Sequence, residues 1–273
     1  MPPYATRTVT LRESPVAPGR PAEIHVREAG SGPPVVILHS GWGYEAYPFD
    51  DAIAALAPAH RVLAPDRVGY GRSGRVEALP PGFHRLMAEE TFAVLDALGI
   101  REAALWGHSD GAVIAAHMAF LAPGRVTAVV LESLHFFALK RASVEFFETA
   151  VRDPEKFGPA AVEACRRDHG DGWKEVLGAG GWAWLDIVDE GRRGKHDVYS
   201  GRLAEVAAPV LVLHGARDPR TEPGELDAAM AALPGARLAL LDAGHCPHTS
   251  REAARAIEAA VRFLSGEGWN AGG

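Results

Sequence analysis

A serine, a histidine and an aspartate in this 273-residue chain have the spacing of a nucleophilic site. Positions 107–111 read Gly-His-Ser-Asp-Gly, a G-x-S-x-G motif centred on Ser109. A short apolar run ends at Trp106, and an alanine-rich run with helical spacing begins at Ala112. A strand that turns sharply into a helix through this motif exposes the serine hydroxyl at a helix N-terminus, where negative charge is favoured. Ser109 is therefore the candidate nucleophile.

A serine hydroxyl is a weak nucleophile near neutral pH, so it needs a base, and the base needs an orienting acid. His245 follows the last predicted strand, and Asp218 follows the strand before it. Residues just beyond the ends of parallel strands converge on one edge of the sheet, so we expect these loops to meet. The alternative acid is Glu132, at the end of another predicted strand. The His-Gly-x-x-Asp setting favours Asp218.

A glycine-rich turn is the candidate oxyanion hole. Positions 39–43 read His-Ser-Gly-Trp-Gly and follow a continuous apolar run. An oxyanion needs backbone N–H donors aimed at the developing charge, and the expected donors are the amides of Gly41, Trp42 and Asp110. A carboxylate at Asp110 suits the first turn of a helix, but it opposes a nearby oxyanion unless the side chain points away.

The elements that must position these residues alternate between strands and helices. Continuous apolar runs predict buried strands over 34–38, 61–64, 103–106, 126–131 and 210–213, with a weaker one over 237–241. Alternating polar and apolar residues predict an antiparallel pair over 6–11 and 23–28. Helical spacing predicts helices over 47–56, 86–98, 112–121 and 251–264, and a frayed tail over 266–273. This order implies an α/β fold, a mostly parallel sheet with helices on both faces.

One long segment interrupts this alternation. Residues 134–205 contain no clear buried strand, which predicts a helical cap inserted into a core domain made of residues 1–133 and 206–273. Aromatic residues of this insertion are expected to bind an apolar or aromatic part of the substrate: Phe136, Phe137, Trp182 and Trp184. The alternative is that they form a small core of the insertion itself. A basic group there is either a carboxylate-binding site or a solvated helix face: Arg166, Arg167 and His169.

Composition excludes several classes of function. A net charge of −7 gives no general attraction for nucleic acid or for an anionic membrane. Two cysteines without a C-x-x-C pair, and histidines without a metal-ligand spacing, predict neither a disulfide framework nor a metal site. The chain shows no apolar run of about 18 residues, and its first residues lack the apolar core of a signal peptide. We therefore expect a cytoplasmic protein that acts on a small molecule without a cofactor.

Taken together, these motifs resemble those of α/β-hydrolase-fold serine hydrolases over nearly the whole chain. Besides the turn at Ser109, the resemblance rests on the segment 39–43, the Asp-x-x-Gly-x-Gly-x-Ser loop at 66–73, and the His-Gly-x-x-Asp and Gly-His-x-Pro-His segments at 214–218 and 244–248. The chain departs from the family at Ser40, where a glycine is usual, and at Asp110. The resemblance implies an eight-stranded sheet with a helical cap, and hydrolysis of an ester-like substrate through an acyl-enzyme on a Ser-His-Asp triad.

Other reactions fit the same residues. The same triad supports C–C bond hydrolysis, lactone hydrolysis and cofactor-free perhydrolysis. Dehalogenases and epoxide hydrolases are disfavoured because they carry a carboxylate where this chain has Ser109. Outside the enzymes, the alternative is a non-catalytic ligand-binding homologue, against which an intact triad argues.

Overall fold

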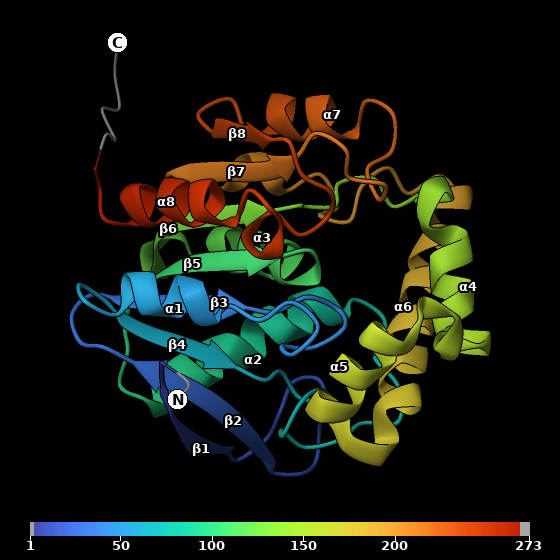
Figure 1. Ribbon diagram of the computed structural model, residues 1–273, viewed down its shortest axis with the longest axis horizontal. Helices are drawn as coiled ribbons and strands as arrows, with labels where there is room; N and C mark the ends of the chain where they lie inside the picture. The colour runs from blue at the N-terminus through green and yellow to red at the C-terminus, as the bar shows by residue number, and fades with distance from the viewer. Residues whose placement is uncertain (1–2, 268–273) are drawn as a thin grey trace.

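The computed structural model describes residues 3–267, which build an eight-stranded sheet with helices on both faces (Figure 1). The strands lie in the order β1-β2-β4-β3-β5-β6-β7-β8. Only β1 with β2 and β2 with β4 pair antiparallel, and the other neighbours are parallel. The strands span Ala5–Leu11 (β1), Ala22–Ala29 (β2), Pro34–Leu38 (β3), Arg61–Pro65 (β4), Ala103–His108 (β5), Val126–Glu132 (β6), Val210–Gly215 (β7) and Arg237–Leu241 (β8). The predicted fold class is confirmed.

Two helix layers bury the two faces of the sheet. The helices of this part are α1 (Asp50–Leu56), α2 (Phe83–Ala97), α3 (Asp110–Leu121), α7 (Glu225–Ala232) and α8 (Ala253–Leu264). In Figure 1, α1 and α8 lie in front of the sheet, and α2 and α3 lie behind it. Along β3, Val35 and Ile37 join the core beneath α1 and α8, whereas Val36 and Leu38 join the core beneath α2 and α3. Because both faces are covered, the strand is apolar at successive positions rather than alternating.

The predicted elements all occur, and the differences lie at their ends. The strand predicted over 103–106 continues to His108, since that residue still pairs with Glu132 of β6. The helices predicted from 47 and 251 begin at Asp50 and Ala253. Residues 268–273 of the predicted tail lie outside the described part of the chain. Within residues 3–267, no helix is both long enough and apolar enough to cross a bilayer.

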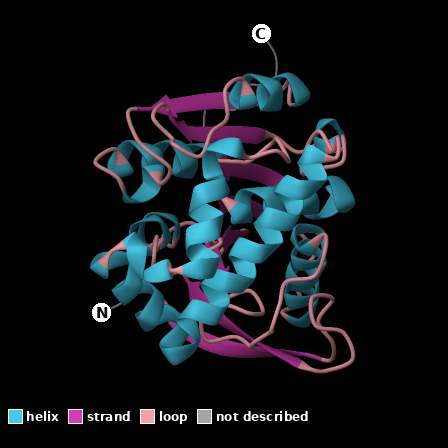
Figure 2. Ribbon diagram, turned by 90° about the vertical axis from the view of Figure 1, so that its right-hand side faces the viewer, coloured by secondary structure: helices cyan, strands magenta, loops and turns pink. Residues whose placement is uncertain are grey.

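Three helices form the insertion between β6 and β7: α4 (Val144–Arg152), α5 (Pro159–His169) and α6 (Trp173–Arg192). They lie across the carboxyl ends of the parallel strands, as the turned view shows (Figure 2). Helix α6 packs closely on α4 at Gly181, where a Cβ atom would fall within 2.9 Å of the Phe147 carbonyl oxygen. The insertion therefore covers the edge of the sheet at which the predicted site residues converge.

A buried ion pair fixes the start of the insertion to the rest of the fold. The Lys140 side chain is fully buried and its ammonium group pairs with the carboxylate of Glu225, at the first position of α7. The same carboxylate accepts hydrogen bonds from the backbone amides of Phe136 (2.7 Å) and Phe137 (3.0 Å). Since a buried charge is costly unless it is paired and hydrogen-bonded, this contact constrains both chain segments.

We predict that Lys140→Met lowers the free energy of unfolding by about 3 kcal/mol, because the Glu225 carboxylate stays buried without its cation. Urea titration followed by circular dichroism measures this effect. The matched control is Lys195→Met, which removes a partly exposed pair with Glu190 and is expected to cost less than about 1 kcal/mol. Equal losses in the two variants would show that the buried pair has no special importance.

Candidate active site

The turn between β5 and α3 holds Ser109 in a strained conformation, with φ of 56° and ψ of −117°. Its backbone amide donates to the Glu132 carbonyl on the neighbouring strand (2.9 Å). The glycines of the motif are required by space: a Cβ at Gly107 would overlap the Gly111 carbonyl, and one at Gly111 would overlap the Leu38 carbonyl. Strand and helix thus approach so closely that the turn between them projects the serine side chain outward.

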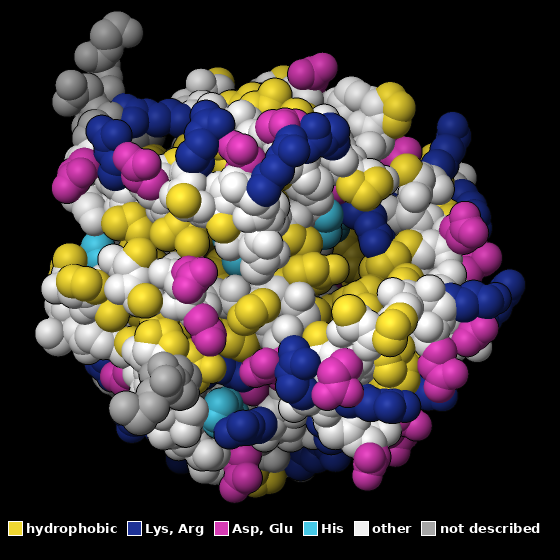
Figure 3. Space-filling view, in the orientation of Figure 1, with side chains coloured by type: hydrophobic (Ala, Val, Ile, Leu, Met, Phe, Trp, Pro, Cys, Tyr) yellow, Lys and Arg dark blue, Asp and Glu magenta, His cyan; other side chains and the backbone are white. Residues whose placement is uncertain are grey.

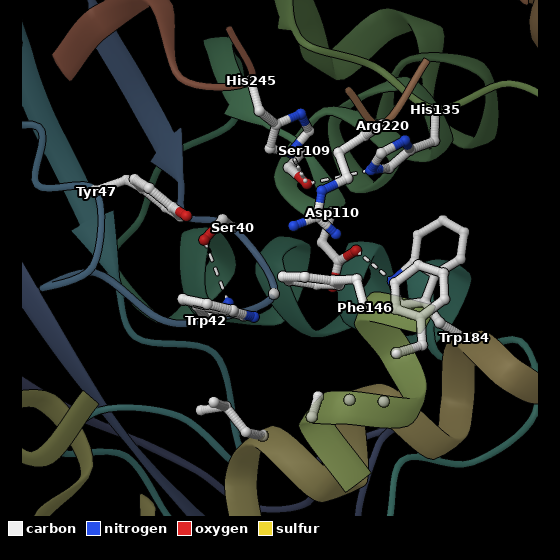
Figure 4. Close-up of a pocket in the computed structure, with 16 residues that line it drawn as sticks. Ser40, Trp42, Tyr47, Ser109, Asp110, His135, Phe146, Trp184, Arg220 and His245 are labelled. Carbon is white, nitrogen blue, oxygen red and sulfur yellow. Dashed lines mark hydrogen bonds between the residues drawn. The ribbon is translucent and has the colours of Figure 1, made fainter. Parts of the chain in front are cut away.

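The structure brings the three predicted triad residues into one hydrogen-bonded chain. His245 Nε2 lies 3.0 Å from Ser109 Oγ (Figure 4). On the other side of the ring, His245 Nδ1 lies 2.8 Å from Asp218 Oδ2. Burial by itself would raise the pKa of Asp218, but the hydrogen bond and charge of His245 and the Arg220 backbone amide lower it to about 2. Asp218 is therefore a carboxylate at neutral pH, as the orienting acid of a triad must be.

Glu132, the alternative acid, has other partners. Its carboxylate accepts from Trp106 Nε1 (2.9 Å) and from the Nδ1 (2.7 Å) and backbone amide (2.9 Å) of His248. Burial opposes ionisation, yet the charge and hydrogen bonds of His248 lower the pKa of Glu132 to about 2. This carboxylate ties the end of β6 to the segment that follows His245, and so it supports the histidine loop instead of contacting the imidazole.

A second histidine reaches the serine. His135 Nε2 lies 3.2 Å from Ser109 Oγ, and its buried ring stacks on that of His245 with centroids 5.5 Å apart. Burial and the positive charge of Lys140 hold the pKa of His135 well below its usual range, so the ring is neutral. Because the single hydroxyl proton of Ser109 goes to His245, His135 is placed to donate its Nε2–H to Oγ. The only sequence signal for His135 is its position just after a strand end.

The oxyanion candidates separate into two groups. Within the described residues, the backbone amides of Gly41 and Asp110 have no hydrogen-bond partner, whereas the Trp42 amide donates to Ser40 Oγ (3.2 Å). Ser40, which stands where a glycine is usual, thus accepts a hydrogen bond from the Trp42 amide, so that this amide is not available to a substrate. Two donors, those of Gly41 and Asp110, remain available for a developing negative charge.

The side chain of Asp110 lies against the pocket. Its Oδ1 accepts from Trp184 Nε1 (2.7 Å; Figure 4). The same oxygen lies 3.6 Å from His84 Nε2. The Asp110 Oδ2 is buried and has no hydrogen-bond partner in the described part of the chain, and it would lie 2.7 Å from a Cβ atom placed at Gly41. Burial would raise the pKa of Asp110, but the nearby His84, the charge of Arg67 and the Trp184 hydrogen bond lower it. The carboxylate is therefore charged beside the oxyanion turn, held there by Trp184.

A pocket with an empty volume of about 580 Å³, partly open to solvent, lies between these residues and the insertion. Figure 3 shows a hollow on this face of the molecule, bordered mainly by hydrophobic side chains. The insertion contributes apolar groups from α4 and α6. The lining residues include Trp42, Tyr47, Phe146, Phe147, Leu177 and Trp184, together with Ser109, His135, Arg220 and His245.

Of the four aromatic residues predicted to bind substrate, the structure brings only Trp184 to this pocket. Trp182 is 60% exposed, because side chains two positions apart on a helix point in nearly opposite directions. Phe136 packs in the main core, and Phe137 packs against Phe136 and His196. The first residues of the insertion turn inward beneath the sheet edge, so the pocket takes its phenylalanines from α4.

The basic group of α5 also lies elsewhere. Arg166 is exposed over the Trp173 ring, and Arg167 is exposed near Glu45. His169 is buried, accepts the Gly71 amide (3.0 Å) and donates to the Trp42 carbonyl (2.9 Å). These residues support loops and do not line the pocket.

Comparisons with known proteins agree with this geometry. Residues 35–259 match the model described as the alpha/beta hydrolase family. Epoxide hydrolase A of Mycobacterium tuberculosis is 44% identical over 124 residues, which cover 44% of this chain and 38% of that protein. A putative carbamate hydrolase, RutD, of Azorhizobium caulinodans is 36% identical over 117 residues, covering 43% of each chain. The match thus spans less than half the length of these curated relatives.

Solved structures match over almost the whole chain. A hydrolase from Pseudomonas aeruginosa PA01 has a TM-score of 0.73 at 23% identity and covers 95% of this chain and 98% of its own. A thermophilic esterase from Thermogutta terrifontis has a TM-score of 0.71 at 20% identity, with 96% and 99% coverage. At these identities the likeness shows a shared fold.

We predict that Asp218→Asn slows covalent labelling of Ser109 by a fluorophosphonate at least about 100-fold, because the His245 imidazole loses its orienting carboxylate. Glu132→Gln is the matched control and is expected to change the rate less than about 10-fold. Intact-protein mass spectrometry over time gives both rates. The reverse ranking would transfer the role of triad acid to Glu132.

The dependence of stability on pH tests whether the Glu132 carboxylate stabilises the fold. Its folded pKa of about 2 lies below the ordinary value of 4.5, so its contribution to stability is present above about pH 5 and is lost as the pH falls toward 2. We expect Glu132→Gln to unfold more easily at pH 7 but to show a flatter loss of stability between pH 5 and 2. The exposed Glu258→Gln should keep the wild-type slope. Parallel slopes for all three proteins would contradict this assignment.

Proposed function

Because the chain belongs to the alpha/beta hydrolase family, we propose that it is a serine hydrolase that cleaves an ester-like carbonyl substrate through an acyl-enzyme. The observation that carries the proposal is the hydrogen-bonded chain Ser109–His245–Asp218 at the floor of an apolar pocket. A serine with a hydrogen-bonded base, itself oriented by a carboxylate, is the arrangement that activates a hydroxyl for acyl transfer.

In this proposal Ser109 Oγ attacks the carbonyl carbon while His245 Nε2 takes the hydroxyl proton. The Asp218 carboxylate stabilises the imidazolium that forms. The carbonyl oxygen, now negative, accepts hydrogen bonds from the amides of Gly41 and Asp110. His245 then gives the proton to the leaving alcohol, the carbon–oxygen bond breaks, and an acyl-enzyme remains. Water, deprotonated by His245, attacks the acyl carbon and releases the acid and free Ser109.

The named relatives raise epoxide opening as a second candidate. In epoxide hydrolases of this fold a carboxylate occupies the nucleophile position, where this chain has Ser109. The carboxylate of Asp110 is one position further on in the chain and accepts the Trp184 hydrogen bond (2.7 Å). These contacts favour the ester reaction. Lactones, C–C bonds activated by a ketone, and peracid formation use the same serine and belong in the substrate screen.

We expect wild-type protein to take a single fluorophosphonate adduct on Ser109 and to hydrolyse short-chain 4-nitrophenyl esters. Ser109→Ala should lose the adduct and lower kcat by about 10⁴- to 10⁶-fold, with an unchanged unfolding midpoint. The exposed Ser265→Ala is the control and should match wild type.

Esterase activity retained in Ser109→Ala would remove the serine from its proposed role. A folded wild-type protein that takes no adduct and turns over no ester would favour a non-catalytic ligand-binding homologue. Styrene oxide, assayed in parallel, tests the epoxide reaction, and its turnover by Ser109→Ala would favour that candidate.

A further inference from the structure

The loop between β7 and α7 places a second charged group in the pocket. Arg220 follows the acid Asp218 by two positions and its side chain points into the pocket on the side of His245 and His135 (Figure 4). Within residues 3–267 its guanidinium forms no ion pair, and it lies over the Phe146 ring, whose centroid is 3.0 Å from Cζ. The buried cations Arg27 and Lys140, in contrast, each pair with a carboxylate.

The backbone around Arg220 is fixed. Its amide donates to Asp218 Oδ1 (2.8 Å), and its carbonyl accepts from the buried Lys140 ammonium. The Phe146 ring that contacts the guanidinium is itself stacked on Trp42, with centroids 5.2 Å apart. Burial lowers the pKa of Arg220 to about 10, which still leaves a cation at neutral pH. The pocket thus presents a positive charge with little freedom to turn away into solvent.

We propose that Arg220 binds a carboxylate group of the substrate, so that this hydrolase prefers esters that carry a carboxylate at a short distance from the cleaved bond. The inference rests on the proposed function above. A guanidinium matches a carboxylate through two parallel N–H donors, and such charge-assisted bonds are strong where water is scarce. The remaining lining of Trp42, Phe147 and Trp184 suits the hydrocarbon between the two groups.

Other charges around the pocket restrict the anion. Asp110 lines the same space, Asp218 lies behind His245 on the side away from Ser109, and both are ionised. Asp218 is bound by His245, and Asp110 is bound by Trp184 and lies outside ion-pair distance of Arg220. One guanidinium near two carboxylates favours a group with one negative charge, such as a carboxylate, over a group with two, such as a phosphate monoester, which would meet greater repulsion. His135 is neutral and adds no second positive charge.

The test compares matched pairs of esters. One pair has the charge on the acyl side, 4-nitrophenyl hydrogen glutarate and its methyl ester, and the other has it on the alcohol side, 4-acetoxybenzoate and its methyl ester. We expect Arg220→Met to lower kcat/KM about 10- to 100-fold for the charged member of at least one pair, mainly through KM. The neutral members should change less than about 3-fold. Arg220→Lys should give kcat/KM values between those of wild type and Arg220→Met, since lysine keeps the charge but lacks the two parallel N–H donors of the guanidinium.

The matched control is Arg166→Met, which removes another guanidinium that lies over an aromatic ring but outside the pocket. It should behave as wild type on all four esters. A measurement without variants complements these: glutarate should inhibit hydrolysis of the neutral ester competitively, and glutaramide should not.

Failure of this inference and failure of the proposed function give different results. If wild type hydrolyses the neutral esters, but Arg220→Met alters no charged-to-neutral ratio and glutarate does not inhibit, the carboxylate site is wrong and the serine hydrolase stands. If Arg220→Met does not fold, Arg220→Lys and the glutarate inhibition decide in the same way. If no ester is cleaved and Ser109 takes no probe, the proposed function fails. Calorimetric binding of glutarate that is present in wild type and weaker in Arg220→Lys would then support the site, and its absence from wild type would overturn it.

Discussion

The close approach of β5 and α3 is the constraint from which the site is built. It leaves no room for a side chain at Gly107, and it holds Ser109 at a positive φ that side-chain-bearing residues rarely adopt. Such a conformation costs about 1–3 kcal/mol and persists only where the surroundings impose it. The approach of α3 to the end of β3, at Leu38, likewise leaves no room for a side chain at Gly111. The Glu132 carbonyl, which accepts the Ser109 amide, belongs to the neighbouring strand. The position of the hydroxyl is thus set by the sheet, and the loops that carry Gly41 and His245 are brought to it by the strand order.

Two buried carboxylates illustrate how surroundings, and not residue type, assign a role. Asp218 and Glu132 lie at neighbouring strand ends, and both are held as anions by histidines. The histidine on Asp218 reaches Ser109, whereas the histidine on Glu132 is buried and donates to the Tyr47 carbonyl. The first pair therefore faces the pocket and the second fixes the loop behind it. A carboxylate–histidine hydrogen bond thus orients the base in one place and fixes a loop in the other.

The sequence predicts most of the framework because apolar runs and strand order are local signals. Val35 to Leu38 are apolar because both sheet faces are covered, and the same order predicts that the loops after β5, β7 and β8 meet. The side of a helix that faces a pocket is not a local signal. Trp182 and Trp184 differ in sequence by two positions and in structure by nearly half a turn, and only packing against α4 decides which of them points inward.

Sequence patterns do not identify His135 or Arg220 as pocket residues, for a related reason. Each lies in a loop without regular spacing, and each reaches the pocket only because the insertion folds over the strand ends. Phe146 and Phe147 likewise replace the expected Phe136 and Phe137, since the chain first turns into the core at Phe136 before α4 begins. These positions depend on contacts between segments far apart in the chain, which hydrophobic periodicity does not encode.

The ion pair between Lys140 and Glu225 limits how the insertion can be exchanged between proteins. Glu225 lies outside the insertion, in the segment that also carries Asp218 and Arg220, yet it binds the Phe136 and Phe137 amides at the entrance to the insertion. The insertion is therefore not a self-contained cassette. A chimera that took residues 134–205 from a relative would bring one half of a buried charge pair and leave the other behind. An exchange that keeps this pair intact has to carry both segments, so the shape of the insertion is coupled to the loop that holds Asp218 and Arg220.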